Sequence, residues 1–394
     1  MVRLGSSLAV FTLAASTARA DSYTLVDTFD ASNFFDEFDF FTEPDPTHGF
    51  VQYVDGYTAN RKGLAGFASG GIYLGVDFNS TTTTGRASVR LTSRKSYTKG
   101  LFVADIAHMP AGTAESSSCG LWPAFWMFGP DWPNSGEIDI LEGVNSQTTN
   151  SVSLHTGPGC TVSNVGSLPG TELVSAECQA DVGCTQNTSA PNNYGASFNA
   201  AGGGIYAVEW TDAAIKVWFL PRDSPVTNEL SSSSSSSTTT STSRVNDINT
   251  TTIITLDPST FGTPLAVFAG GPECAIADHF ANHNLVVDTT FCGDWAGRVW
   301  DSDATCAALA DTCEEYVGAH PEAFADAYWI FRSIRVYQLQ FDTDPRADGT
   351  GGGGSGEYND QGSEERGGVG GREAARQRWL RGSLRPEMAR KWRA

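Results

Sequence analysis

The segment Trp132-Pro-Asn-Ser-Gly-Glu-Ile-Asp-Ile-Leu-Glu-Gly-Val-Asn145 decides the fold of this chain. It places three carboxylates, Glu137, Asp139 and Glu142, within six residues, with only isoleucine and leucine between them. Acidic residues that alternate with apolar ones predict a β-strand with one apolar face and one acidic face. Three like charges side by side do not stabilise a strand, and their repulsion raises the pKa of at least one carboxyl group.

The spacing of the three acids predicts an irregular strand. Glu137 and Asp139 are two residues apart and share a face, whereas Glu142 would point to the opposite face of a regular strand. One extra residue, a β-bulge at Ile140-Leu141, would return Glu142 to the acidic face. A site that holds one protonated and one ionised carboxyl group is what cleavage of a glycosidic bond requires. The competing interpretation is an acidic strand that deters aggregation.

The same segment resembles the signature of glycoside hydrolase family 16, in the version with the bulge, at Gly136-Glu-Ile-Asp-Ile-Leu-Glu-Gly143. The resemblance to the fungal endo-1,3(4)-β-glucanases, or laminarinases, covers roughly residues 21–342. Further matching stretches are His108-Met-Pro-Ala-Gly112, Leu121-Trp-Pro-Ala-Phe-Trp126, Ser153-Leu-His-Thr156 with Cys160, and Phe291-Cys-Gly-Asp-Trp-Ala-Gly297. The resemblance implies an all-β jelly-roll sandwich of two antiparallel sheets, with the acidic strand on the concave face of one.

The resemblance also implies a role for each acid in a retaining, endo-acting enzyme on β-1,3- or mixed β-1,3/1,4-glucans. Glu137 would be the nucleophile and Glu142 the general acid/base, while Asp139 would assist the nucleophile. We expect neither a metal nor a cofactor, because carboxylates supply the acid, the base and the nucleophile.

Aromatic residues around the acidic strand are candidates for substrate binding, because a flat indole can bury the apolar face of a sugar ring. Trp132 lies in a Pro/Gly-rich loop just before the strand, and Trp295 lies in a turn-like segment. For Trp122, packing in the sandwich core is the favoured interpretation. The predicted substrate-binding residues are Trp126, Trp132, His155 and Trp295.

His155 lies in a stretch that is predicted to pair with the acidic strand. The resemblance places it near Glu142, where it would adjust the pKa of the acid/base or hold substrate. A Ser-His-Asp triad is the competing use of His155, but no Gly-x-Ser-x-Gly elbow supplies the serine. Gly202-Gly-Gly204 is no phosphate-binding loop, because it lacks the lysine and the helix that should follow.

The N-terminus, residues 1–20, has the pattern of a secretory signal peptide. Arg3 is followed by the short apolar run Leu8–Ala15 and the cleavage motif Ala18-Arg-Ala20. No other stretch approaches the roughly twenty apolar residues that span a bilayer. We therefore expect a soluble, secreted, monomeric protein that begins at Asp21. Three N-glycosylation sequons, at Asn79, Asn187 and Asn249, are consistent with the secretory route.

The eight cysteines predict disulfides in a secreted chain. They are Cys119, Cys160, Cys178, Cys184, Cys274, Cys292, Cys306 and Cys313. The sequence does not choose among the pairings, although Cys178 with Cys184, and Cys306 with Cys313, would close short loops. A zinc site is the weaker alternative, because no C-x-x-C pair occurs and the histidines do not cluster with the cysteines.

The formal net charge of −20 argues against nucleic acid and anionic membrane as partners. It suits a neutral polymer such as a β-glucan.

Short runs of Val, Ile, Phe, Tyr and Thr, punctuated by Gly, Pro and Asn, predict one strand-rich domain over residues 21–342. A hairpin is predicted for Ile205–Trp210 with Ile215–Phe219, and one short helix for Asp303–Val317. A Ser/Thr-rich insertion at residues 230–252 and a Gly/Arg-rich tail at 343–394 are predicted to be disordered, since neither can bury enough apolar surface.

Two other function classes remain open. A carbohydrate-binding protein on the same fold would have lost the acids, which are all present. A cell-wall transglycosylase would keep the nucleophile and pass the glycosyl group to a sugar, and the motif does not distinguish it from a hydrolase.

Overall fold

The computed structural model describes residues 22–112, 118–180, 183–232 and 254–339. The predicted signal peptide and C-terminal tail lie outside the described residues. Residues 233–252 of the predicted insertion lie outside them as well. Within the described ranges, no helix combines the length and the apolar character that a bilayer crossing needs.

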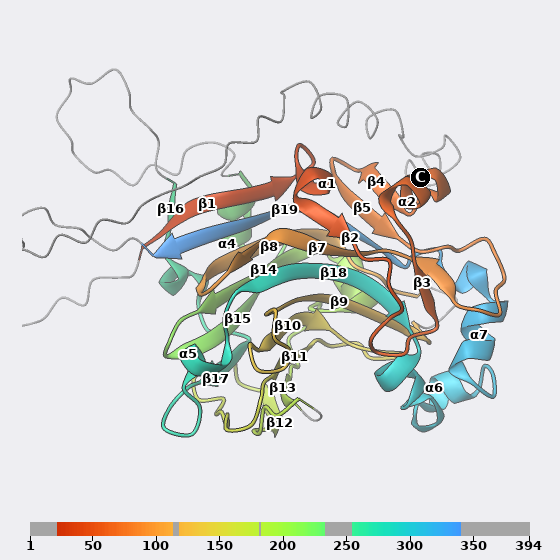
Figure 1. The fold of residues 1–394 in the computed structure, drawn as a ribbon. Coiled ribbons are helices and arrows are strands. Elements are labelled where there is room, and N and C mark those ends of the chain that lie inside the picture. Colours follow the sequence, from red (N-terminus) through yellow and green to blue (C-terminus); the bar gives the residue numbers. More distant parts are fainter. Residues whose placement is uncertain (1–21, 113–117, 181–182, 233–253, 340–394) are drawn as a thin grey trace, which may run out of the picture.

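Two large antiparallel sheets form the body of the molecule (Figure 1). Sheet A has the order β16 (Thr255–Leu256), β1 (Tyr23–Asp30), β19 (Tyr328–Leu339), β8 (Gly100–His108), β14 (Gly204–Trp210), β15 (Ala214–Pro221), β17 (Ala266–Ala269). The strand β5 (Gly71–Gly75) also pairs with β19 and carries β4 (Ala65–Ala68). Sheet B has the order β12 (Glu172–Ser175), β13 (Cys184–Asn187), β11 (Ser151–His155), β10 (Glu137–Glu142), β9 (Leu121–Phe128), β18 (His283–Phe291), β7 (Arg90–Tyr97), β2 (Phe38–Phe40).

Short elements decorate these sheets. A small parallel pair joins β3 (Val51–Tyr53) to β6 (Arg86–Ser88). The α-helices among the described residues are α1 (Phe34–Glu37), α2 (Gly56–Lys62), α3 (Gly195–Ala200), α4 (Pro225–Ser232), α5 (Ile276–His279), α6 (Ala304–Ala307) and α7 (Cys313–Ala319). The predicted hairpin is confirmed, because β14 and β15 pair from Trp210↔Ile215 onward. Where one helix was predicted, between residues 303 and 317, the chain forms two, α6 and α7.

The main core lies between the two sheets. Ile138 and Leu154 of sheet B are fully buried in it, and Val208 and Ile334 of sheet A belong to the same cluster. Because side chains alternate along a strand, the residues between these apolar ones point to the outer face of sheet B. The predicted two-sheet sandwich is therefore confirmed, and its outer sheet B face carries the acids.

The predicted start of the disordered insertion is wrong. Leu230 belongs to the last turn of α4, and it is only 4% exposed, packed in an apolar cluster with Trp218 and Leu220 on the outer face of sheet A. The strands on either side of the insertion, β15 and β16, join the same sheet. The serine run therefore interrupts sheet A without dividing the chain into separate sheets.

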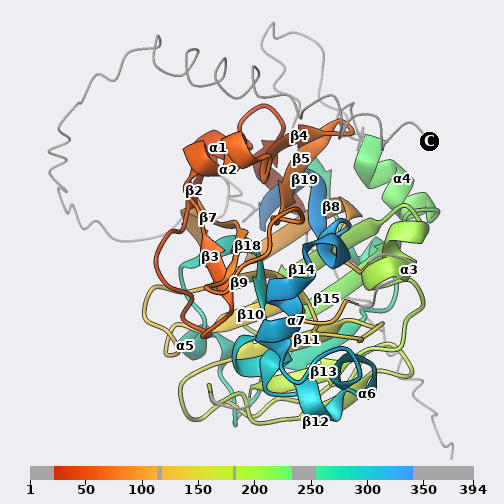
Figure 2. The same cartoon turned by 90° about the vertical axis from the view of Figure 1, so that its right-hand side faces the viewer.

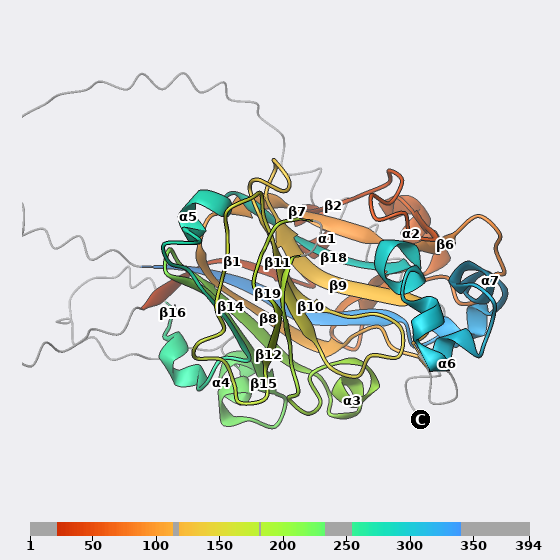
Figure 3. The same cartoon turned by 90° about the horizontal axis from the view of Figure 1, so that it is seen from below.

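The helices α6 and α7 form a small lobe at one end of the sandwich, the end that faces the viewer in Figure 2. Figure 3 places α5 and β16 at the opposite end. The lobe has its own core, which contains Trp300, Tyr316 and Phe324. It covers the ends of β9 and β18, where Leu121 and Phe291 pair.

Four disulfides connect the eight cysteines. Of the two pairs that would close short loops, Cys178–Cys184 is formed and Cys306–Cys313 is not. Cys306 of α6 bonds to Cys119, which precedes β9, and Cys313 of α7 bonds to Cys292, which follows β18. Since β9 and β18 are neighbours, the two bonds tie the two helices of the lobe to adjacent strand ends. Cys160–Cys274 is the fourth bond.

Candidate active site

The acidic strand β10 contains the predicted bulge. Against β9, Asp139 pairs with Trp126, while the next partner, Phe125, pairs with Leu141, so one residue of β10 is left over. Ile140 and Leu141 are both fully buried in the core, and Glu142 returns to the outer face. The bulge is thus the feature that puts all three acids on one side of the sheet.

Asn150, which the sequence did not single out, satisfies the backbone that the bulge leaves unpaired. Its Nδ2 donates to the carbonyl of Ile140 at 2.8 Å, and its Oδ1 accepts from the amide of Glu142 at 2.8 Å. Asn150 is fully buried. Because an unpaired buried backbone group is costly, this side chain stabilises the irregular strand at Glu142.

The three acids open into a cavity of about 390 Å³ on the outer face of sheet B. The cavity is lined by the predicted residues Glu137, Asp139, Glu142, Trp126 and Trp132. It is also lined by residues that were not predicted to belong to the site, among them Asp45, Arg90, Trp122, Asp288 and Thr290. Trp132 is 50% exposed at its rim.

Each of three tryptophans in the cavity donates its indole N–H to a different carboxylate. Trp132 Nε1 donates to Glu137 Oε2 at 2.8 Å, and Trp122 Nε1 donates to Glu142 Oε1 at 2.6 Å. Trp126 Nε1 donates to Asp288 Oδ1 at 2.7 Å. The ring bodies remain as apolar surface, so these residues can orient the acids and contact a sugar at the same time.

The two glutamates differ in their electrostatic surroundings. Burial, together with the charges of Glu137 and Asp288, raises the pKa of Glu142 to about 8, although the Trp122 bond opposes the rise. Burial also raises the pKa of Glu137, but His155, Trp132 and Arg90 all lower it. Glu142 is therefore the carboxyl group that holds a proton at neutral pH, whereas several groups favour the carboxylate of Glu137.

Asp139 lies between the two glutamates and is only 3% exposed. Burial and then the charges of Glu137 and Glu142 raise its pKa well above the ordinary value. A hydrogen bond with Glu137 adds to this rise and lowers the pKa of Glu137 in return. Asp139 is thus a proton donor to Glu137, in line with its predicted assisting role.

Asp288 is a fourth buried carboxyl group of the cavity, contributed by β18. It accepts hydrogen bonds from Tyr53 Oη at 3.0 Å and from Trp126, and burial raises its pKa to about 6 despite the nearby Arg90. The guanidinium of Arg90 lies 4.6 Å from the ring centre of Phe41 and 4.9 Å from that of Trp126. This stacked cation partly balances the negative charge of the cavity.

The prediction that His155 lies near Glu142 is wrong. In the register of β10 and β11, His155 is opposite Glu137, and Glu142 is opposite Ser151. Since β10 is bulged but still extended, the two glutamates lie at opposite ends of it, and His155 Nε2 is 3.4 Å from Asp139 Oδ2. His155 therefore acts on the Glu137 side, where its charge lowers the pKa of that carboxyl.

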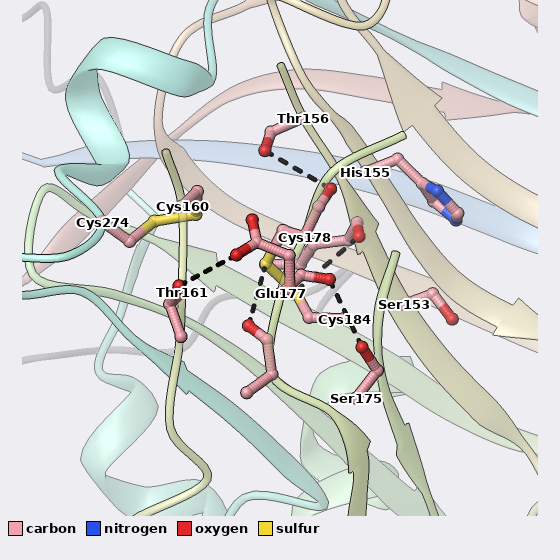
Figure 4. The surroundings of a disulfide bond; sticks show 12 residues. Ser153, His155, Thr156, Cys160, Thr161, Ser175, Glu177, Cys178, Cys184 and Cys274 are labelled. Atoms are coloured by element: carbon pink, nitrogen blue, oxygen red, sulfur yellow. Dashed lines mark hydrogen bonds between the residues drawn. A yellow bond between two sulfur atoms is a disulfide. The ribbon is translucent and has the colours of Figure 1, made fainter. Parts of the chain in front are cut away.

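His155 lies in the surroundings of the Cys178–Cys184 disulfide, with its ring directed away from the two sulfur atoms (Figure 4). The Nδ1 atom of His155 lies 2.9 Å from the carbonyl of Ala180. Gly183 leaves room for the ring, because a Cβ at this position would lie 2.5 Å from Cε1 of His155. The local disulfide thus helps to fix the imidazole orientation.

Trp295 lies beside the cavity, and its predicted role in substrate binding stays a prediction. It packs against Trp122 in a T-shaped arrangement, with ring centres 5.7 Å apart, and the residue of its turn that lines the cavity is Asp294. Trp122, in turn, lines the cavity and was wrongly assigned to the core. Trp122 and Trp126 are four residues apart on one strand, so the strand period alone could have placed both on the same face.

Glu137, Asp139 and His155 also offer one ligand atom each within 4.8 Å of one another. Within this set, Asp139 shares a hydrogen bond with Glu137, and His155 Nε2 lies 3.4 Å from Asp139 Oδ2.

The chain matches the family described as "XgeA-like, catalytic GH16 domain" over residues 38–337. It is 40% identical over 326 residues to an endo-1,3(4)-β-glucanase of Arthroderma benhamiae, covering 80% of this chain and 65% of that one. It is 39% identical over 351 residues to the endo-1,3(4)-β-glucanase xgeA of Emericella nidulans, covering 86% of this chain and 51% of that one. The chain thus spans about half to two thirds of these relatives.

Solved structures show the same fold. Laminarinase 16A of Phanerochaete chrysosporium, a GH16 protein solved with β-glucans in its donor and acceptor sites, is 38% identical with a TM-score of 0.69, covering 80% of this chain and 100% of that one. An elongating GH family 16 β-1,3-glucosyltransferase is 40% identical with a TM-score of 0.67, at the same coverage. The sandwich is accordingly a β-jelly-roll, and the chain belongs to glycoside hydrolase family 16.

Proposed function

We propose that this chain is a secreted, retaining endo-β-glucanase that hydrolyses β-1,3- and mixed β-1,3/1,4-glucans. The observation that carries the proposal is the unequal pair of glutamates, Glu137 and Glu142, on one wall of a cavity. The names of the relatives support the substrate class and the endo mode.

The first step forms a covalent intermediate. The carboxylate of Glu137 attacks the anomeric carbon, and the glycosidic C–O bond breaks as Glu142 gives its proton to the leaving oxygen. Trp132 and Asp139 hold Glu137 by hydrogen bonds. These bonds orient the nucleophile without neutralising it.

The second step releases the sugar. Once Glu137 is an ester, its charge is gone, so the pKa of Glu142 falls and its carboxylate can take a proton from water. Water then attacks the anomeric carbon, the ester bond breaks, and Glu137 leaves as a carboxylate. The two displacements retain the anomeric configuration.

The test is product analysis with laminarin and a mixed-linkage glucan. Laminarin should yield a ladder of shorter oligosaccharides, and NMR should show the β-anomer first. Activity on xylan or chitin with none on laminarin would overturn the proposed substrate, and full loss of activity in chelator would contradict catalysis by carboxylates alone. Products longer than the starting oligosaccharide would instead identify a transglycosylase, the activity named for one structural neighbour.

Secretion has a separate test. The mature chain should begin at Asp21 when the protein is made in a eukaryotic host, as N-terminal sequencing will establish. The pairing of all eight cysteines supports an oxidising compartment. Asn79 and Asn187 are exposed sequons that a glycan can reach. An intact residue 1 on the exported protein would contradict the proposed cleavage.

The pH dependence of kcat/KM should be bell-shaped. Glu142 must be protonated in the free enzyme, so activity should fall as the pH rises through its pKa of about 8. Glu137 must be ionised, so activity should also fall as the pH drops through its pKa, which lies above the ordinary value. Initial rates on laminarin below KM measure both limbs. A basic limb near the ordinary glutamate pKa would contradict the assignment of Glu142.

Asp139→Asn should impair the enzyme less than the loss of either glutamate. Asparagine keeps a donor toward Glu137 but cannot place a shared proton between the two groups. We expect kcat on laminarin to fall by about 10- to 100-fold, a range below the full contribution of a general acid. Asp139→Ala, which removes the donor, is the matched comparison and should be the slower variant. Equal rates for the two would show that the hydrogen bond to Glu137 is unimportant.

A further inference from the structure

Asn145 connects three parts of the molecule at the end of the acidic strand. It is only 2% exposed, and it uses both ends of its amide. Oδ1 accepts from the backbone N–H of Gly120 at 2.9 Å, just before β9, and Nδ2 donates to the carbonyl of Ala296 at 2.8 Å. Its φ of 53° is in the left-handed region, which asparagine adopts more readily than most residues. Asn145 therefore fixes the turn of residues 293–297 to the start of β9.

That turn carries Trp295, and the lobe supports it from the other side. Cys292, just before the turn, is bonded to Cys313 of α7, and its amide donates to the carbonyl of Gly120 at 2.9 Å. Trp295 contacts the ring of Trp122 at right angles, 5.7 Å between centres. The turn is thus held from both sides, and the surface that it presents to β9 is the ring of Trp295.

Trp122 links these contacts to the acid Glu142. It is partly exposed and lines the cavity, and its N–H donates to Glu142 Oε1 at 2.6 Å. A side chain that is open on one face depends on its neighbours to keep one rotamer. Here the neighbouring ring is Trp295, and the position of Trp295 depends on Asn145.

We propose that Asn145 and Trp295 are positioning residues that hold the indole of Trp122 against Glu142, and so set the pH range in which Glu142 can donate its proton. This inference rests on the proposed function of Glu142 as the acid/base. Asn145 and Trp295 need not touch the substrate to have this effect.

The direction of the effect follows from the hydrogen bond. An indole N–H favours the carboxylate of Glu142, so its loss or displacement makes the carboxyl group hold its proton to higher pH. The charged and titratable groups that share the cavity with Glu142 are Glu137, Asp139, Asp288, Arg90, Asp45 and Asp294, and Tyr194 faces it from the loop before α3. The substitutions below leave all of these in place.

The experiment is the pH profile of kcat/KM on laminarin for the full chain and its variants. Trp122→Phe should move the basic limb upward by about one pH unit, the amount expected for one hydrogen bond to a charged group. Asn145→Gly, which tolerates the positive φ, and Trp295→Leu should move the limb in the same direction by about half as much. All three should still cleave an aryl β-laminaribioside with a good leaving group, because that reaction needs no acid.

Two further variants serve as controls. Trp218→Phe removes an indole that donates to Gly262 on the far side of the protein, and its profile should equal that of the wild type. Trp126 lies on the same strand as Trp122, and its indole N–H donates to Asp288. Trp126→Phe removes this hydrogen bond. Asp288 would then hold its proton more tightly and repel Glu142 less, so the basic limb should not rise.

The results of this experiment distinguish a failure of the inference from a failure of the proposed function. An inactive wild type on laminarin would refute the proposed function. An active wild type whose basic limb is unchanged in Trp122→Phe would refute the inference alone. A shift in Trp122→Phe with none in Asn145→Gly and Trp295→Leu would show that these two residues do not position the indole. If Trp122→Phe fails to fold, the other two variants carry the test, and a shared upward shift supports the inference.

Discussion

Glu137→Ser is expected to reduce kcat on laminarin by about 10⁴-fold or more, the order of loss that follows removal of a covalent nucleophile. Glu137 shares a cavity with the proton donor Glu142 and is oriented by Trp132. Serine is too short to reach the anomeric carbon, and no glycosyl-enzyme should accumulate with an activated fluoride donor. Mass spectrometry of the quenched protein measures the covalent adduct directly.

The control for Glu137→Ser is rescue by a small anion. Azide can enter the space left by the carboxylate and attack an activated donor, which should yield the glycosyl azide of inverted configuration. Trp132→Phe is a matched variant that keeps the nucleophile but loses its hydrogen bond, and it should retain the ability to form the adduct. Full activity of folded Glu137→Ser would show that another residue is the nucleophile.

Glu142→Ser is expected to lose about 10²- to 10⁴-fold in kcat on laminarin, the usual contribution of a positioned acid/base. The loss should depend on the leaving group. A dinitrophenyl β-glycoside departs without a proton, so the glycosyl-enzyme should form at nearly the normal rate and then accumulate, because no base activates water.

The matched measurement for Glu142→Ser is its pH profile. In the wild type the basic limb belongs to the buried Glu142, with its pKa of about 8, and this limb should disappear in the variant. Azide should now give the glycosyl azide of retained configuration. If the losses on laminarin and on the activated substrate were equal, Glu142 would not be the proton donor.

The acidic strand could be read from the sequence because its pattern is local. Glu137 and Asp139 follow the strand period, and the extra residue before Glu142 is visible as a break in that period. The apolar residues at the bulge, Ile140 and Leu141, are both buried, so the core and the cavity together fix the register. Asn150 could not be predicted, since its role exists only once β10 and β11 are paired.

The remaining cavity residues come from strands whose sequences do not mark them. Asp288 lies in an apolar run of β18, and Arg90 lies in β7, which is separated from β10 by the two strands β9 and β18. Neither residue has another acid or a known motif next to it in the sequence that would indicate a functional site. Cys306 and Cys313 are near each other in the chain, whereas the folded lobe brings Cys306 to Cys119, 187 residues away. Non-local pairing of this kind is invisible to any reading of spacing.

The order of strands in sheet A bears on how the protein is made. β19, the last strand in the described chain, lies between β1, the first, and β8. Until Tyr328–Leu339 has been synthesised, β1 has no partner on that side and β8 remains an open edge, a template for pairing with other chains. Assembly of such distant segments is slow, because the chain loses conformational entropy on closing the long loop before the stabilising contacts form. Productive folding therefore waits for the end of the domain, and the growing chain depends on protection from aggregation until β19 has been synthesised.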